Sequence, residues 1–163
     1  MSSRRVYRNW VAGEGLVSYT VSIGSTDLHI STDRDLRQEA LESAARHRHS
    51  VEYYIHSHPR FATNLEPVDA HPDAPSLVCE MAAAARIGRV GPMAAVAGAI
   101  AEAVGRDLLQ SSRQVIVENG GDIFMSVSSP RTVGVYAGGS SLSGRIGLVI
   151  HPDDCPLGLC TSS

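Results

Sequence analysis

A glycine turn flanked by two acids has the most chemical content of any part of this 163-residue sequence. It reads Val-Glu-Asn-Gly-Gly-Asp-Ile and follows an apolar run that predicts a strand. An Asn-Gly hairpin turn accounts for Asn119 and Gly120, but it does not require both Glu118 and Asp122. Gly120 and Gly121 would let a phosphate approach the backbone, while the carboxylates take hydroxyls or a divalent cation. The turn is therefore a candidate ligand site, with Glu118 and Asp122 as metal ligands.

A second candidate is the predicted helix start Gly91-Pro92-Met93. Proline suits the first turn of a helix, and the free N–H groups of that turn bind anions. Gly91 and Met93 would then offer backbone donors on either side of Pro92. A plain helix start, joined to its neighbour by a tight turn, is the competing interpretation.

Hydroxyl groups gather in the last residues, where Thr161, Ser162 and Ser163 follow a cysteine. Thr161 and Ser162 are candidate nucleophiles, Asp122 completes the candidate catalytic set, and Ser163 is a candidate ligand-binding residue. His58, at the entrance to a proline-rich loop, is a candidate base or ligand-binding residue. A polar chain end without chemistry is the alternative, and no recognised triad order is present.

The charge composition excludes several kinds of chemistry. All fourteen basic side chains are arginines, against seventeen acids, and the formal net charge is -3. A chain without lysine cannot form a Schiff base or use a P-loop lysine, and this charge gives no extended basic face for nucleic acid. Arginine, Mg²⁺ or helix dipoles would have to neutralise an anionic ligand.

Histidine and cysteine spacings do not predict a metal site. None of the seven histidines forms a recognised ligand spacing, and surface or capping roles are expected for them. Cys155 and Cys160 are separated by four residues and have no second pair, so free thiols are favoured over zinc.

The order of the patterns predicts an α+β fold with a mostly antiparallel sheet and helices on one face. Thr32 or Asp33 is expected to cap a long helix that ends near Ser57, and two further helices are expected over 75–87 and 92–109. Residues 58–75 should form a long loop. The small residues of the last helix permit a close approach to a sheet, a helix or a ligand. Strands are expected at 7–11, 16–23, 27–31, 114–118, 123–127, 132–137 and 146–150.

No apolar run is long enough for a membrane span, and the first residues lack the apolar core of a signal peptide. The expectations are a cytoplasmic location, no membrane partner and a single domain over 1–163.

Three segments together resemble an uncharacterised bacterial and archaeal family of the ApbE-like superfamily, whose best-known members are FAD:protein FMN transferases. They are the helix start 90–100, the turn 117–123 and the end 160–163. The resemblance implies an ApbE-like fold, a flavin nucleotide and Mg²⁺. Gly120, Gly121 and Asp122 match the transferases' Gly-Gly-Asp turn, and Thr161 and Ser162 match a later nucleotide-binding segment. The transferases' lysine has no counterpart at Gly91-Pro92-Met93.

The same resemblance implies a further C-terminal segment beyond Ser163, so a companion segment or chain is expected. A shortened sequence, a truncated gene and cleavage of a precursor would each account for its absence. We expect a protein that binds an anionic small molecule or nucleotide, and an enzyme of undefined reaction. The alternatives are a hydrolase or transferase with a Thr or Ser nucleophile at a self-processed chain end, and a non-catalytic oligomeric binding module. A homo-oligomer is expected from the small-residue helix.

Overall fold

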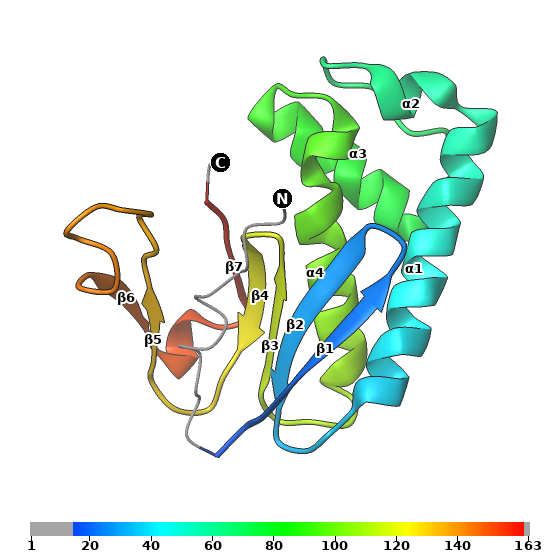
Figure 1. Ribbon diagram of the computed structural model, residues 1–163. Coiled ribbons are helices and arrows are strands. Elements are labelled where there is room, and N and C mark those ends of the chain that lie inside the picture. The colour runs from blue at the N-terminus through cyan, green and yellow to red at the C-terminus, as the bar shows by residue number, and fades with distance from the viewer. Residues whose placement is uncertain (1–14, 162–163) are drawn as a thin grey trace.

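A five-stranded antiparallel sheet carries the long helices on one of its faces (Figure 1). The computed structural model describes residues 15–161. Segments far apart in the chain lie side by side, because the strand order is β1-β2-β3-β4-β7. The strands are β1 Val17–Ile23, β2 Thr26–Thr32, β3 Val115–Asn119, β4 Asp122–Ser126 and β7 Leu157–Leu159.

Two tight hairpins build most of this sheet. Gly24 has a φ of 56° in the turn between β1 and β2, and Gly120 and Gly121 have φ of 66° and 117° between β3 and β4. Positive φ at both Gly120 and Gly121 suits a two-residue turn whose twist matches the strands. A hairpin is therefore present, but its central residues are Gly120 and Gly121 rather than the Asn119 and Gly120 of an Asn-Gly turn, because Asn119 belongs to β3 and pairs with Asp122.

The α-helices described in residues 15–161 all come from the chain between β2 and β3. They are α1 Arg37–Ser57, α2 Pro59–Thr63, α3 Ser76–Gly88 and, after the 3-10 turn η2 Pro92–Ala95, α4 Val96–Leu108. Their apolar side chains form the main core with the inner face of the sheet. Its fully buried members include Leu28, Ile30, Val78, Val104 and Val117.

Helix α4 lies close to the sheet because its small residues leave room for the strands. Gly105 faces the Phe124 ring of β4, and a Cβ at this position would overlap the ring atoms. The close approach that the small residues predict is therefore made to the sheet. No single helix in residues 15–161 is long and apolar enough to span a membrane. Helix α3 and the segment Pro92–Leu108 together reach the necessary length and apolar composition, but the chain bends by 106° between them.

A smaller core covers the other face of the sheet. It contains Met125, Val127 and Ile150, with partly buried apolar residues around them. The elements that build it follow β4 in the chain: a two-stranded sheet of β5 Arg131–Gly134 and β6 Gly147–Ile150, the 3-10 turn η3 Pro152–Asp154, and β7.

The expected cap of the long helix is wrong. Helix α1 begins at Arg37, and neither Thr32 nor Asp33 caps it. The Asp33 carboxylate instead accepts hydrogen bonds from the Arg113 backbone N–H at 2.7 Å and the Ser112 hydroxyl at 3.2 Å. Burial alone would raise the pKa of Asp33, but the hydrogen bonds lower it. Asp33 thus contacts residues distant in sequence instead of the nearby helix start, and these contacts join the end of β2 to the segment just before β3.

The coarse fold class is confirmed, since the molecule is α+β with an antiparallel sheet and helices on one face. Two elements differ from the expectation. The loop expected over 58–75 contains α2, whose Phe61 is buried, and β7 forms where no strand was predicted. The three residues of β7 are too few to show a periodic pattern. The strand expected at 7–11 lies outside the described residues.

The contact between α4 and β4 generates a stability prediction. Gly105→Ala should lower the free energy of unfolding by about 1–3 kcal/mol, because the Phe124 ring must move. The matched control is Gly98→Ala on the same helix, where the nearest atom to an added Cβ, Asp122 Oδ2, is 3.6 Å away. This control should be neutral or stabilising by about 0.5–1 kcal/mol through helix propensity. Urea unfolding measures both, and equal stabilities of the two variants would contradict the packing argument.

Candidate functional site

The polar side chains of the glycine turn serve first to attach the sheet to α4. Asn119 donates a hydrogen bond from Nδ2 to the Ala97 carbonyl at 3.0 Å. The Asp122 carboxylate accepts the backbone N–H of Gly98, in the first turn of α4. Burial raises the pKa of Asp122, and this hydrogen bond only partly offsets the effect. A carboxylate at a helix N-terminus is also favoured by the helix dipole.

The structure does not bring Glu118 and Asp122 together. Successive strand residues point to opposite faces of a sheet, so Glu118 lies on the face opposite Asn119 and Asp122. Glu118 is buried there and accepts the Gly121 backbone N–H at 3.1 Å. Within residues 15–161, no group of three or more His, Cys, Asp or Glu side chains is placed to hold a metal ion. The residues described do not fit a metal centre.

Thr161 lies beside the glycine turn. A Cβ on Gly121 would be 2.8 Å from Thr161 Oγ1, so this position needs glycine both for space and for its φ. The turn and Thr161 are thus neighbours in space, while the ligand site expected from them stays a prediction. Ser162 and Ser163 lie outside the described residues, and the catalytic roles of Thr161, Ser162 and Asp122 stay predictions.

At the predicted helix start, glycine has a packing reason. A Cβ on Gly91 would overlap the backbone carbonyl of Asn64, which belongs to the loop after α2. Pro92 is buried, and the Gly91 carbonyl accepts the Ala94 N–H to open the 3-10 turn η2. Met93 differs from its neighbours because its side chain lines a cavity described below.

His58 belongs to an aromatic cluster at the end of α1. Its ring stacks on Tyr54 with centroids 4.1 Å apart, and its Nδ1 lies 3.1 Å from the Tyr54 carbonyl oxygen. The Tyr54 hydroxyl accepts the His71 backbone N–H at 3.0 Å, while Phe61 meets the Tyr54 ring edge-on. These contacts hold the 58–75 loop against α1. The contacts described for His58 and Thr161 thus involve different elements.

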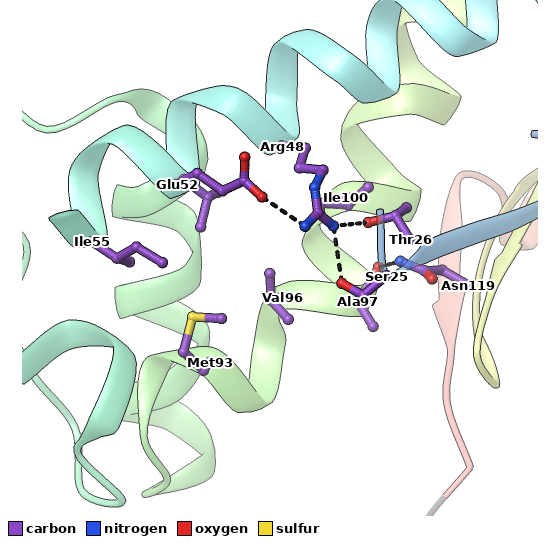
Figure 2. A pocket seen from close by; sticks show the side chains of 11 residues that line it. Ser25, Thr26, Arg48, Glu52, Ile55, Met93, Val96, Ala97, Ile100 and Asn119 are labelled. Atoms are coloured by element: carbon purple, nitrogen blue, oxygen red, sulfur yellow. Dashed lines mark hydrogen bonds and ion pairs between the residues drawn. The ribbon is translucent and has the colours of Figure 1, made fainter. Parts of the chain in front are cut away.

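A cavity of about 230 Å³ opens between α1, the start of α4 and the turn between β1 and β2 (Figure 2). Its two ends differ in polarity. Apolar side chains line most of the wall: Val51, Ile55, Met93, Val96, Ala97 and Ile100. Polar side chains gather toward the other end: Ser25, Thr26, Arg48, Glu52 and Asn119. Of the residues predicted from the sequence, Met93 and Asn119 take part in this lining.

Arg48 dominates the electrostatics of the cavity. One terminal nitrogen donates to the hydroxyls of Ser25 and Thr26, both at 3.0 Å, and the other pairs with Glu52 at 2.6 Å. The Arg48 side chain is 23% exposed, whereas the four other arginines with a described ion pair are 60–69% exposed. The Gly24 turn covers the guanidinium, since a Cβ there would lie 2.9 Å from Arg48 Cζ.

Sequence reasoning missed Arg48, Ser25, Thr26 and Glu52 at the polar end of this cavity, although one signal was present. Val51 and Ile55 belong to the predicted apolar stripe of the long helix, and Arg48 precedes them by three and seven residues. This spacing places a cation within the apolar face rather than on the opposite, solvated one. Ser25 and Thr26 carried no comparable signal, because hydroxyl residues at a hairpin turn are common.

A second polar cluster joins α1 to α4. Asp107 Oδ2 accepts hydrogen bonds from Ser43 at 2.6 Å and Arg46 at 2.6 Å, and it lies 2.9 Å from His47 Nε2. Ser43, His47 and Asp107 meet here, but the serine hydroxyl and the histidine ring both contact Asp107 Oδ2. In a nucleophile–base–acid relay the histidine would lie between the serine and the aspartate. The cluster therefore acts as a clamp between the two helices that border the cavity.

The family follows from comparison with known proteins. Residues 8–163 match the family described as AbpE bacteria, and the chain belongs to this family. Its relatives include UPF0280 proteins of archaea: one of Methanococcus aeolicus, 38% identical over 152 residues, and one of Methanococcoides burtonii, 42% identical over 135 residues. A third, of Methanocaldococcus jannaschii, is 40% identical over 133 residues. The matches cover 91%, 82% and 80% of this chain but 61%, 56% and 54% of the relatives.

The expected membership of the ApbE-like superfamily of FMN transferases is wrong. The matching family is described as AbpE bacteria, and the relatives named above are UPF0280 proteins, with no FMN transferase family among these findings. The flavin nucleotide and Mg²⁺ that this resemblance implied have no support from these relatives. Short glycine and hydroxyl motifs recur in unrelated sites, which is why they indicated the wrong relationship.

The clamp at Asp107 generates a pH prediction. Burial alone would raise the pKa of Asp107, but the hydrogen bonds from Ser43 and His47 and the charge of Arg46 lower it overall. A carboxyl group whose pKa is lower in the folded state stabilises the fold above its unfolded pKa of about 3.9, and this contribution disappears as the pH falls through the folded pKa. Asp107→Asn should therefore cost about 1–2 kcal/mol at pH 7 and much less at pH 2–3.

Urea unfolding of both proteins across this pH range measures the difference. The control is Asp73→Asn, whose side chain is 92% exposed and which should be neutral throughout. A difference between wild type and Asp107→Asn that stays constant down to pH 2 would show that the charge of Asp107 does not stabilise the helix pair.

Proposed function

We propose that this protein binds a small molecule with an apolar body and one anionic group in the cavity between α1 and α4. The observation that carries the proposal is the position of Arg48. Arg48 is three-quarters buried at the polar end of a cavity with a mostly apolar lining, and burying a cation is costly unless it is paired. Its counter-ion Glu52 is 52% exposed. An anionic ligand would replace this exposed carboxylate on Arg48.

The polar end suits a carboxylate or phosphate. Arg48 supplies a fixed guanidinium fork, which matches the planar geometry of oxygen anions. The hydroxyls of Ser25 and Thr26 lie within hydrogen-bond distance of the same guanidinium and add donors beside it. Arginine is one of the groups expected to neutralise an anionic ligand in this chain without lysine, beside Mg²⁺ and helix dipoles.

The remaining walls suit an apolar body. Ile55 of α1 lies on the Met93 side of the cavity, away from Ser25 and Asn119 (Figure 2), and Val51 adds to the apolar lining. Small-molecule sites commonly combine such a mostly apolar lining with a few polar groups that orient the ligand. A cavity of about 230 Å³ accommodates a ring system of modest size rather than a dinucleotide.

Glu52 would tune the affinity. Its carboxylate holds one side of the Arg48 guanidinium at 2.6 Å, while its own side chain is 52% exposed and able to swing into solvent. An incoming anion would take the place of Glu52 on Arg48. The carboxylate thus neutralises Arg48 in the empty site and competes with the ligand.

The remaining functional expectations stay predictions. They are a hydrolase or transferase nucleophile at Thr161 or Ser162, a non-catalytic oligomeric module, and a cytoplasmic location. The binding proposal does not depend on any of them. Thr161 and Asp122 lie at the glycine turn and are not among the side chains that line the cavity.

The test uses 2-naphthoate and 1-naphthyl phosphate as anionic probes and 2-naphthalenemethanol as the neutral analogue, with binding followed by fluorescence titration. Arg48→Gln should weaken binding of the anionic probes about ten- to hundredfold, because it removes charge-assisted hydrogen bonds. The same variant should change binding of the neutral analogue little. Glu52→Gln should tighten binding of both anions several-fold by removing the competing carboxylate.

The control variant is Arg86→Gln, which removes a surface arginine paired with Asp69 and should leave all three affinities unchanged. Thermal unfolding of each variant separates loss of fold from loss of binding. Equal affinities for the naphthoate and its neutral analogue in the wild type, or an equal loss of both in Arg48→Gln, would contradict a site for anions.

A further inference from the structure

The β5–β6 hairpin and the loop between its strands carry many exposed apolar side chains. The hairpin lies away from the helices (Figure 1), and its buried residues join the smaller core on the other face of the sheet. Of the twelve large hydrophobic residues that are exposed in residues 15–161, six fall within positions 135–149. They are Val135, Tyr136, Leu142, Ile146, Leu148 and Val149, each 38–57% exposed. Several exposed apolar residues within one short segment indicate an interaction surface more strongly than single ones do.

One end of the hairpin is anchored in the smaller core. Ile150, the last residue of β6, is buried with Met125 and Val127 in the smaller core. The preceding residues Leu148 and Val149 are 53% and 57% exposed, and strand alternation places them on opposite faces of the hairpin. Both faces of β6 are therefore open to solvent next to its anchored end.

The outer backbone edges of the hairpin are a second feature of this surface. β5 and β6 pair with each other from Arg131 opposite Ile150 to Gly134 opposite Gly147. In residues 15–161 no third strand joins this pair. A two-stranded ribbon is marginal in water, and its outer edges present N–H and C=O groups that another strand can pair with.

The greater length of related proteins indicates where such a strand comes from. The chain spans only 54–61% of the length of the three relatives named above, so these relatives contain a large amount of polypeptide beyond the part shared with this chain. We propose that the β5–β6 hairpin is the docking surface for an extended segment of this remaining part of the family polypeptide. The segment adds a strand to the hairpin and covers Leu148 and Val149.

Charge further defines the segment. Positions 131–150 contain two arginines, Arg131 and Arg145, and no Asp or Glu. A strand that docks here is therefore apolar on the face toward the hairpin and carries no excess of positive charge, because like charges across adjacent strands are destabilising. The proposal is independent of the cavity, which lies on the helix-covered face of the sheet.

Hydrogen exchange in an intact relative provides the first test. Amides of the Methanococcus aeolicus protein in the strand that aligns with β6 should exchange at least about tenfold more slowly than those of Gly147–Ile150 in this chain, since strand pairing protects N–H groups. Mass spectrometry of peptides from both proteins measures the rates. Equally fast exchange in the two proteins would overturn the proposal.

The second test changes the surface in the intact relative. Aspartate is placed in the full-length Methanococcus aeolicus protein at the residue that aligns with Val149, and separately at the residue that aligns with Ile87, which is 88% exposed on α3 in this chain. The first change should speed exchange in the strand that aligns with β6 about tenfold, and the second should not.

Two results would contradict the proposed occupant. One is absence of protection at β6 when the segment is present. The other is a homodimer of this chain, seen by native mass spectrometry, in which β6 is already protected and Val149→Asp restores the monomer; the hairpin would then be an interface between two copies. The naphthoate titration tests the cavity and not this face of the sheet. A negative result at the hairpin would therefore not bear on the proposal that the cavity binds an anion.

Discussion

The close contact between α4 and the sheet determines where everything else in the molecule lies. Gly105 brings the helix backbone against Phe124, and the Ala97 carbonyl and Gly98 N–H are near enough to accept and donate hydrogen bonds with Asn119 and Asp122. Larger side chains on α4 would separate the layers and leave these polar groups buried without partners, which is costly. Packing and hydrogen bonding therefore require the same interlayer distance.

Helix α1 is placed by its attachments to α4 and to the first hairpin. The Asp107 clamp joins it to α4, and Arg48 joins it to the turn that carries Ser25 and Thr26. From Arg48 toward the end of α1 the two helices leave the cavity, whose apolar wall comes from both helices and the η2 turn before α4. The cation at its polar end contributes to the fold and is also the group that an anionic ligand would contact.

The two faces of the sheet are covered to different extents. The helix-covered face has a continuous core and fully buried side chains such as Leu28 and Val104. The other face has a small core that ends at Ile150, with exposed apolar residues beyond it. Relatives of this family are longer than the part shared with this chain, and a further strand on this face is consistent with that extra length.

Local patterns in the sequence were sufficient for the α+β class, for most strands and helices, and for a hairpin at the glycine pair, because periodicity and turn conformation depend on near neighbours. The same reasoning recognised that the small residues of α4 allow close packing. Strand alternation across the turn also separates Glu118 from Asp122, although the acids looked like one cluster when only their spacing was considered. The motif resemblance to FMN transferases was wrong, since short motifs do not establish kinship.

Tertiary structure alone decided which surfaces and partners meet. Arg48 donates hydrogen bonds to Ser25 and Thr26, which lie 23 and 22 residues earlier in the chain. Asp33 does not cap the helix as expected but accepts a hydrogen bond from the backbone N–H of Arg113, 80 residues away. No window of local sequence contains both members of such pairs. The position of a cation in an apolar stripe could be read from α1, but the cavity around it exists only once the hairpin, α1 and α4 have packed together.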